Sequence, residues 1–317
     1  MVSIRSACFL ALCLFSIAPE SRAQVQFPVA FEASAAVLTV PERAAITSHF
    51  QAAGAAWVRQ LDLSAPRSIE VTVGIDNTRP TAGGSSVTSV FVGVIGGRDT
   101  FEQAAAAELR GGVDPNGATA DIRITFNINY LRNELWFDPD PFARSAAVPS
   151  NRTDAMSVAL HELGHAFVYN GFANLNTGQS PPTFWSTWDR FTTPGPPIYF
   201  DGVQAVVAAG MRPEQTTGNI FHWANATAMA ARPSVSTPRF SLVDGVPQPH
   251  PVDCDLHSID ANSPLARALA DTSLLGELMN GVVFIRGTRY KISSLDRAVL
   301  RDLNLMTTLF GNGFEAN

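Results

Sequence analysis

Residues 153–171 read TDAMSVALHELGHAFVYNG, and this stretch decides the fold that the sequence predicts. Apolar residues recur with helical period, Thr153 is expected to cap a helix that begins at Asp154, and Asn170-Gly171 is a typical helix stop. On such a helix two histidines four positions apart lie on one face, about one turn from each other. The stretch therefore predicts an apolar helix that presents two imidazoles on one side.

The central five residues, His161-Glu162-Leu-Gly-His165, match the H-E-x-x-H motif of zinc hydrolases. Two imidazoles suit one tetrahedral zinc, and Glu162 can accept a proton from a zinc-bound water and deliver it to a leaving amine. A chance histidine pair on a solvated helix is the alternative. Apolar neighbours such as Leu160 and Phe167 argue against it, because buried imidazoles without partners cost free energy. The motif predicts a catalytic zinc with Glu162 as general base.

The third protein ligand that a catalytic zinc takes is left open by the residues alone. His49 falls on an earlier predicted helix and is expected to be a core residue. The remaining candidates are His222, His250 and His257, and Asp201 is the candidate for an aspartate ligand. The downstream glutamates do not lie in a second active-site helix.

The segment S-L-L-G-E277-L-M279-N-G resembles the methionine turn of a known family, the metzincins. Within that family its sequence is most similar to the leishmanolysin-like branch. D253-C-D-L-H257-S-I-D precedes it, S294-L-D-R-A-V-L-R-D-L resembles the closing helix, and D121-I-R-I-T-F-N resembles the edge strand. The resemblance spans roughly 122–305. It implies that Met279 forms an apolar floor under the zinc and that His257 is the third ligand. His222 stays an alternative, because His-Trp pairs occur at that ligand in the branch, although positions 222 and 279 are 57 apart.

Two positions depart from the family pattern. Metzincins place Gly three residues after the second histidine, whereas this chain has Val168, so the helix is expected to run nearly a turn longer. Some metzincins have Tyr two residues after the methionine, where Gly281 stands here, so carbonyl polarisation would rest on the metal or another donor.

Around the central helix the pattern predicts an α+β fold. An amphipathic helix is expected over 41–61, with Pro41 in its first turn. β-strands are expected over 68–75, 87–95 and 122–128, and together they suggest one small sheet with a helix packed on it. The Gly-rich segment 82–84 is expected to be a turn, 172–255 to be loops and short helices, and 293–296 to be a capping box that opens a last helix. The resemblance makes this one bilobed, metzincin-like catalytic domain over 24–309, with an upper lobe over about 24–171, a lower lobe over about 172–309 and a tail over 310–317.

Composition sets the remaining expectations. A net charge of −6 without a basic run excludes a nucleic-acid partner. Residues 1–23 have one early cation, a short apolar run and small residues before Ala23, which predicts a cleaved signal peptide and a secreted or periplasmic protein without a transmembrane segment. The mature chain would keep only Cys254 and could form no internal disulfide.

The sequence therefore predicts a secreted zinc metalloendopeptidase with one catalytic zinc, acting on a protein or peptide. A catalytically inactive zincin-fold binding protein and a zinc hydrolase of non-peptide amides are the alternatives. The cleavage preference, a structural calcium, the role of Cys254 and the oligomeric state stay open.

Overall fold

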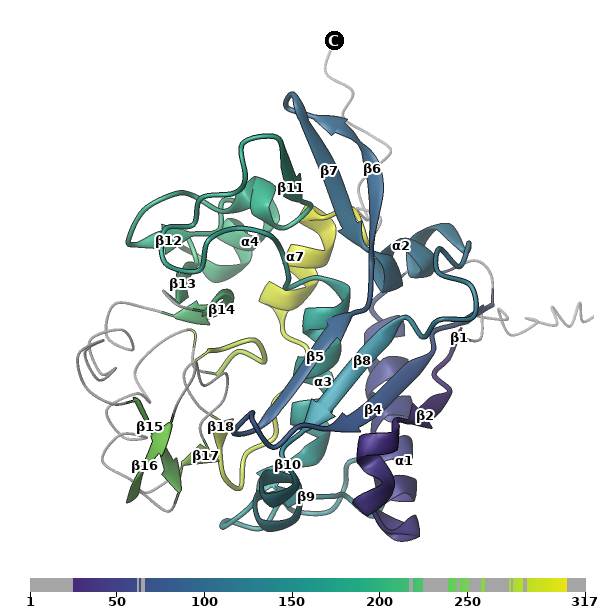
Figure 1. Cartoon of the computed structure of the whole chain (residues 1–317). Helices are drawn as coiled ribbons and strands as arrows, with labels where there is room; N and C mark the ends of the chain where they lie inside the picture. The colour runs from purple at the N-terminus through teal and green to yellow at the C-terminus, as the bar shows by residue number, and fades with distance from the viewer. Residues whose placement is uncertain are drawn as a thin grey trace, which may run out of the picture.

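The computed structural model describes residues 25–61, 63, 66–216, 219–224, 239–243, 246–250, 258–259, 274, 276–281 and 284–306. The expected signal peptide, Cys254, His257 and the tail over 310–317 lie outside these ranges. The fold is a mixture of helices and small sheets, as expected for an α+β protein (Figure 1). No helix among the described residues is long and apolar enough to cross a membrane.

In chain order, the helices and strands form a first run up to residue 126 and a second run from residue 130 onward. The first run consists of β1 (Val25–Gln26), β2 (Val29–Phe31), the 3-10 helix η1 (Ala33–Val37), α1 (Val40–Val58), β3 (Arg67–Ser68), β4 (Val71–Ile75), β5 (Ala82–Ser86), β6 (Ser89–Ile95), β7 (Arg98–Gln103), α2 (Ala104–Gly111) and β8 (Ile122–Phe126). The second run consists of the π-helical turn η2 (Tyr130–Glu134), β9 (Leu135–Trp136), β10 (Thr153–Asp154), α3 (Ala155–Phe167), β11 (Phe184–Ser186), the 3-10 helix η3 (Asp189–Phe191), β12 (Ile198–Tyr199), α4 (Val203–Ala209), β13 (Glu214–Thr216), β14 (Asn219–Ala224), β15 (Arg239–Val243), β16 (Val246–His250), β17 (Ser258–Ile259), β18 (Phe284–Ile285) and α7 (Ser294–Asp302).

Helix α1 forms where the apolar spacing predicts it. Thr39 is its N-cap and forms a capping box with Glu42, and Pro41 lies in the first turn, where its missing N–H leaves no bond unmade. Its apolar face, which includes Phe50 and Trp57, is buried in the main core. The Trp57 indole donates to the carbonyl of Leu160 at 2.9 Å, so α1 is tied directly to α3.

A four-stranded sheet packs against α3 in the order β2-β4-β8-β5. Strands β2, β4 and β8 are parallel, whereas β5 runs antiparallel to β8 and forms one edge of the sheet. Helices α1 and α3 lie on the same side of this sheet (Figure 1). The edge strand therefore borders the helix that carries the two motif histidines.

The strand assignment corrects two expectations. The Gly-rich segment at 82–84, expected as a turn, is part of β5, and the predicted strand over 87–95 belongs to a separate sheet with the order β11-β7-β6. The glycines fit a strand here because α3 lies unusually close. A Cβ placed on Gly84 would lie 2.5 Å from the carbonyl oxygen of Glu162, so only glycine allows this approach.

Both ends of α3 differ from the prediction. Thr153 pairs with Leu135 in the β10–β9 ladder, so Asp154 is the N-cap and accepts a hydrogen bond from the Ser157 amide at 3.2 Å. The helix ends at Phe167 rather than running a turn further, because Val168 leaves the helical conformation with φ −138° and ψ −52°. The amides of Val168 and Tyr169 both bond the Gly164 carbonyl, which closes the helix without the expected glycine.

The segment after α3 contains short strands as well as the loops and short helices that were expected. Its tryptophans Trp188 and Trp223 are fully buried and pack against one another with ring centroids 5.5 Å apart, so they are core residues rather than an open cleft lining. Helix α7 begins at the predicted capping box of Ser293 and Asp296, and it packs against α4.

Candidate metal centre

Three histidines from two elements converge at one point. His161 and His165 project from α3, and His222 projects from β14. Their Nε2 atoms are 3.1 Å apart between His161 and His165, and each lies 2.9 Å from the Nε2 of His222. His161 and His222 are buried, and His165 reaches the wall of a cavity. Three nitrogen donors at such distances form a group that could hold one metal ion.

The other ring nitrogens fix the protonation of the motif histidines. His161 Nδ1 lies 2.8 Å from the carbonyl oxygen of Leu278, and His165 Nδ1 lies 2.8 Å from that of Tyr169. A carbonyl only accepts, so each Nδ1 must carry the proton, and in a neutral imidazole the Nε2 atom then carries a bare lone pair. The two Nε2 atoms of α3 therefore face each other as acceptors with no proton between them.

Burial keeps these imidazoles neutral. It lowers the pKa of His161 well below its ordinary value, and the charge that His165 would carry lowers it further, against a smaller opposing effect of the bond to the Leu278 carbonyl. Burial likewise lowers the pKa of His165 to about 4. At neutral pH both side chains are thus in the form that binds metals.

Met279 forms the floor beneath α3. It is fully buried, and a Cβ placed on Gly164 would lie 2.6 Å from its sulfur atom. The glycine between the two histidines therefore lets the segment 276–281 approach the helix closely. This approach also places the Leu278 carbonyl against the His161 ring.

The same segment positions His222. The Trp223 amide donates to the Met279 carbonyl at 2.8 Å, and the Gly281 amide donates to the Trp223 carbonyl at 3.1 Å, so β14 runs alongside the methionine segment. A Cβ on Gly281 would collide with the Cβ atom of His222. The packing of His222 thus requires glycine at position 281.

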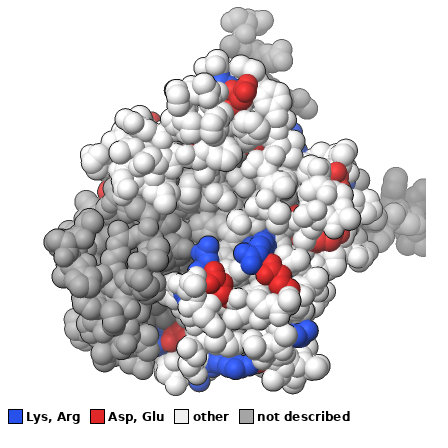
Figure 2. Space-filling model, in the orientation of Figure 1, with Lys and Arg blue, Asp and Glu red and all other residues white. Residues whose placement is uncertain are grey.

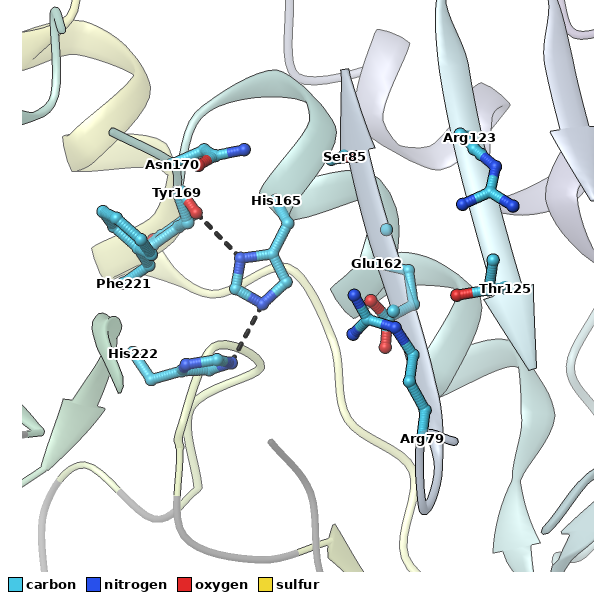
Figure 3. Close-up of a pocket in the computed structure, with 12 residues that line it drawn as sticks. Arg79, Ser85, Arg123, Thr125, Glu162, His165, Tyr169, Asn170, Phe221 and His222 are labelled. Atoms are coloured by element: carbon cyan, nitrogen blue, oxygen red, sulfur yellow. Dashed lines mark hydrogen bonds between the residues drawn. The ribbon is translucent and has the colours of Figure 1, made fainter. Parts of the chain in front are cut away.

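A cavity of about 170 Å³ opens beside the histidines. Its walls come from β5, β8, α3, β14 and the segment that precedes β5, and they include Glu162, Arg79, His165 and His222. Figure 3 shows His165 and His222 facing one another, with Glu162 and Arg79 toward the β5 side. The charge of Arg79 contributes to the lowered pKa of His165, so this cation acts on the site electrostatically.

Charges around the cavity are largely paired. Arg123, which also lines it, forms a two-point ion pair with Glu32 at 2.6 and 2.9 Å. On the face shown in Figure 2, acidic and basic side chains lie beside each other in small groups. The cavity therefore combines an acid, Glu162, with the cation of Arg79, rather than presenting one sign of charge.

The other residues considered as zinc ligands lie either away from the histidine group or outside the described residues. His49 is a buried core residue, as expected: its Nδ1 donates to the Ala45 carbonyl at 2.7 Å and its Nε2 accepts from the Asp138 amide at 3.0 Å. Asp201 pairs with Arg212 at a partly exposed site and is not in the histidine group, so it is wrong as a ligand candidate. His257 and the side chain of His250 lie outside the described residues, and the preference for His257 stays a prediction. The residue that the described structure adds to the two motif histidines is His222.

No protein-family model, no curated protein and no solved structure matches this chain.

Proposed function

We propose that this protein is a zinc-dependent metallopeptidase whose metal is held by His161, His165 and His222. The observation that carries the proposal is the pair of bare Nε2 atoms on α3, 3.1 Å apart, with the His222 nitrogen 2.9 Å from both. Two lone pairs that face each other at this distance repel, and a cation between them turns the repulsion into coordination. A hydrogen bond between the His161 and His165 Nε2 atoms cannot do so, because the ring proton of each is on Nδ1 and is donated to a carbonyl.

Zinc fits the donor set better than other common ions. Three imidazoles without a carboxylate are typical of zinc sites and unsuited to calcium or magnesium. At a Zn–N distance of about 2.0–2.1 Å, tetrahedral geometry separates two ligand nitrogens by roughly 3.3 Å, close to the separations here. The carbonyl bonds behind His161 and His165 orient the rings, as the outer partners of zinc ligands commonly do.

We assign the role of general base to Glu162. It follows the first ligand on α3, is 1% exposed, and borders the cavity together with His165 and His222. Zinc held by the three histidines would polarise a peptide carbonyl and lower the pKa of a water molecule. The Glu162 carboxylate would accept the proton of the attacking water and release it to the leaving amine.

The edge strand β5 supports an extended peptide as the substrate. Its residues Gly83, Gly84 and Ser85 line the cavity, and it pairs with β8 on one side only within the described sheet. An extended chain could therefore add to the free side of β5 through main-chain hydrogen bonds. Such an addition would bring a backbone carbonyl toward the histidine group.

Arg79 supplies a cation to the same cavity. We assign it to the stabilisation of negative charge that develops on the substrate oxygen during attack, because a positive group is more effective in a partly enclosed site than in open water. This would provide the donor that the sequence leaves unidentified where Gly281 replaces a tyrosine.

A metzincin-like fold is part of the proposal. It is supported by the HELGH helix packed on a sheet with an antiparallel edge strand, and by Met279 beneath that helix. Residues 1–23 have the sequence pattern of a signal peptide, which supports export of the enzyme.

Casein hydrolysis by purified protein, with zinc content measured on the same samples, tests the proposal. The expected result is one zinc per chain with activity in the wild type, and full zinc content with activity reduced by about 10²–10⁴-fold in Glu162→Gln. A wild type that holds zinc but cleaves neither casein nor a peptide library would favour a binding protein or an amide hydrolase of another class. A wild type without zinc would overturn the proposal.

A further inference from the structure

A second group of metal-binding side chains lies away from the histidines, between α2 and the start of β8. It consists of Glu108 on α2, Asp114 in the following loop and Asp121 immediately before β8, and ligand oxygens of the three lie within 4.8 Å of one another. Glu108 is 5% exposed and Asp121 is fully buried, whereas Asp114 is exposed. Acids on a surface commonly gather without consequence, but two of these three are in the interior.

Each of the two buried carboxylates has one oxygen without a hydrogen-bond partner among the described residues. These atoms are Oε2 of Glu108 and Oδ1 of Asp121. The second oxygen of Asp121 accepts from the Glu70 amide at 2.8 Å, so the side chain is held in place with its remaining oxygen unsatisfied. A buried carboxylate oxygen without a partner is costly, and two in one group indicate that a ligand normally satisfies them.

The loop between the acids offers further oxygen. Asn116 Oδ1 is also buried without a partner in the described structure, and its main-chain amide donates to Asp114 Oδ1 at 2.9 Å. The Gly117 amide donates to the same Asp114 oxygen at 2.7 Å, so the loop folds around this carboxylate. Among the described residues, the group therefore offers three carboxylates, with the amide oxygen of Asn116 two residues after Asp114 on the same loop.

We propose that Glu108, Asp114 and Asp121, with the amide oxygen of Asn116, form a calcium site that ties α2 and its following loop to β8. Oxygen-only donors of this kind suit a hard divalent cation. The irregular arrangement, with ligands from a helix, a loop and a strand start, suits Ca²⁺, which accepts six to eight oxygens in flexible geometry, better than Mg²⁺, which requires a near-ideal octahedron.

The electrostatics of the group are consistent with a bound cation. Burial raises the pKa of both Glu108 and Asp121, and the charge of each neighbouring acid adds to the effect for Glu108. The alternative is a proton shared between the two carboxylates. Both states relieve the repulsion, but only the calcium state makes stability depend on the calcium concentration.

The site would support the sheet that borders the metal centre. Asp121 begins the connection into β8, the strand that pairs with the edge strand β5, and α2 contacts α3. Calcium at this position would therefore hold the start of β8 in place from a site remote from the histidine group. Its role would be structural, so its loss should lower thermal stability without removing zinc.

Calcium titration of the purified full chain tests the inference. All samples carry one equivalent of zinc and no chelator, so that the histidine group is equally loaded, and Tm and calcium stoichiometry are measured in 0–10 mM CaCl2. The wild type is expected to bind one calcium and to gain about 3–8 °C in Tm. Glu108→Gln and Asp121→Asn should lose this gain, whereas Asp99→Asn, which removes an exposed carboxylate elsewhere, should retain it.

Asp114→Asn keeps the test valid should the buried variants fail to fold, because Asp114 is exposed and an asparagine oxygen can still accept the loop amides. It should weaken calcium binding by at least 10-fold. A wild-type Tm that does not respond to CaCl2, or variants that respond as the wild type does, would overturn the inference and favour the shared proton. An equal response to MgCl2 would overturn the assignment to calcium.

Discussion

Replacing Gly164 by alanine tests the packing that supports the metal centre. The added Cβ would lie 2.6 Å from the Met279 sulfur, 3.1 Å from its Cε atom and 3.3 Å from Cζ2 of Trp57. All three atoms are buried, so the neighbours must shift to accept the methyl group. The methionine segment would move with them, and it carries the Leu278 carbonyl that bonds His161.

Two opposing effects set the magnitude. Overpacking a core costs about 1–3 kcal/mol, whereas alanine in place of glycine within a helix stabilises by about 1 kcal/mol. The expected net loss in the free energy of unfolding is therefore roughly 0–2 kcal/mol. Gly111→Ala on α2 is the matched control, because its Cβ would meet nothing within 4 Å, and it should show only the favourable helix effect.

A double-mutant cycle isolates the contact. Met279→Ala alone should cost about 2–5 kcal/mol, and the Gly164→Ala methyl should fill part of the resulting cavity. Urea unfolding at fixed zinc concentration should then show a favourable coupling of roughly 1–2 kcal/mol between the two substitutions. Additivity within about 0.5 kcal/mol would refute the close approach of Met279 to α3.

Three further substitutions test other parts of the account. Burial raises the pKa of Glu277 to about 7, so the contribution of this group to stability is complete below the unfolded pKa of about 4.5 and is lost as pH rises through 7. In thermal unfolding, the stability of Glu277→Gln relative to the wild type should therefore increase as pH rises from about 4.5 to about 8. A stability difference that stays constant across this pH range would contradict the burial of Glu277. Arg79→Gln should lower kcat/KM by about 10²-fold at unchanged zinc content, and an unaltered rate would remove Arg79 from the mechanism. Gly281→Ala should push His222 out of place and weaken zinc binding by about 10–100-fold in a competition titration, while equal affinity would show that β14 tolerates the added methyl.

Local signals predicted much of the fold from the sequence. Pro41 in the first turn of α1, the Ser293 cap of α7 and the four-residue separation of the motif histidines each act within one helix, so their outcome depends little on distant contacts. The C-terminal end of α3 could not be predicted from local sequence signals. It is set by the bonds of two amides to Gly164 and by the tertiary packing of Val168, which no helix-stop residue marks.

The missed features depend on contacts between distant segments. Glycines 83 and 84 read as a turn, yet they allow an edge strand to lie against α3, a requirement visible only once the helix is in place. The 57-residue separation of His222 from Met279 favoured His257 as the third ligand, whereas the bridge between Trp223 and Asn280 brings His222 beside the methionine segment in space. The adjacent His-Trp pair was the signal that pointed to this residue.

Zinc stoichiometry by elemental analysis of the purified wild type, His222→Ala and His257→Ala decides which histidine completes the metal centre. We expect one zinc per chain in the wild type and in His257→Ala, and a large loss in His222→Ala, because the His222 Nε2 atom lies 2.9 Å from both motif nitrogens. Full zinc in His222→Ala together with its loss in His257→Ala would refute His222 as a ligand and assign the third position to His257.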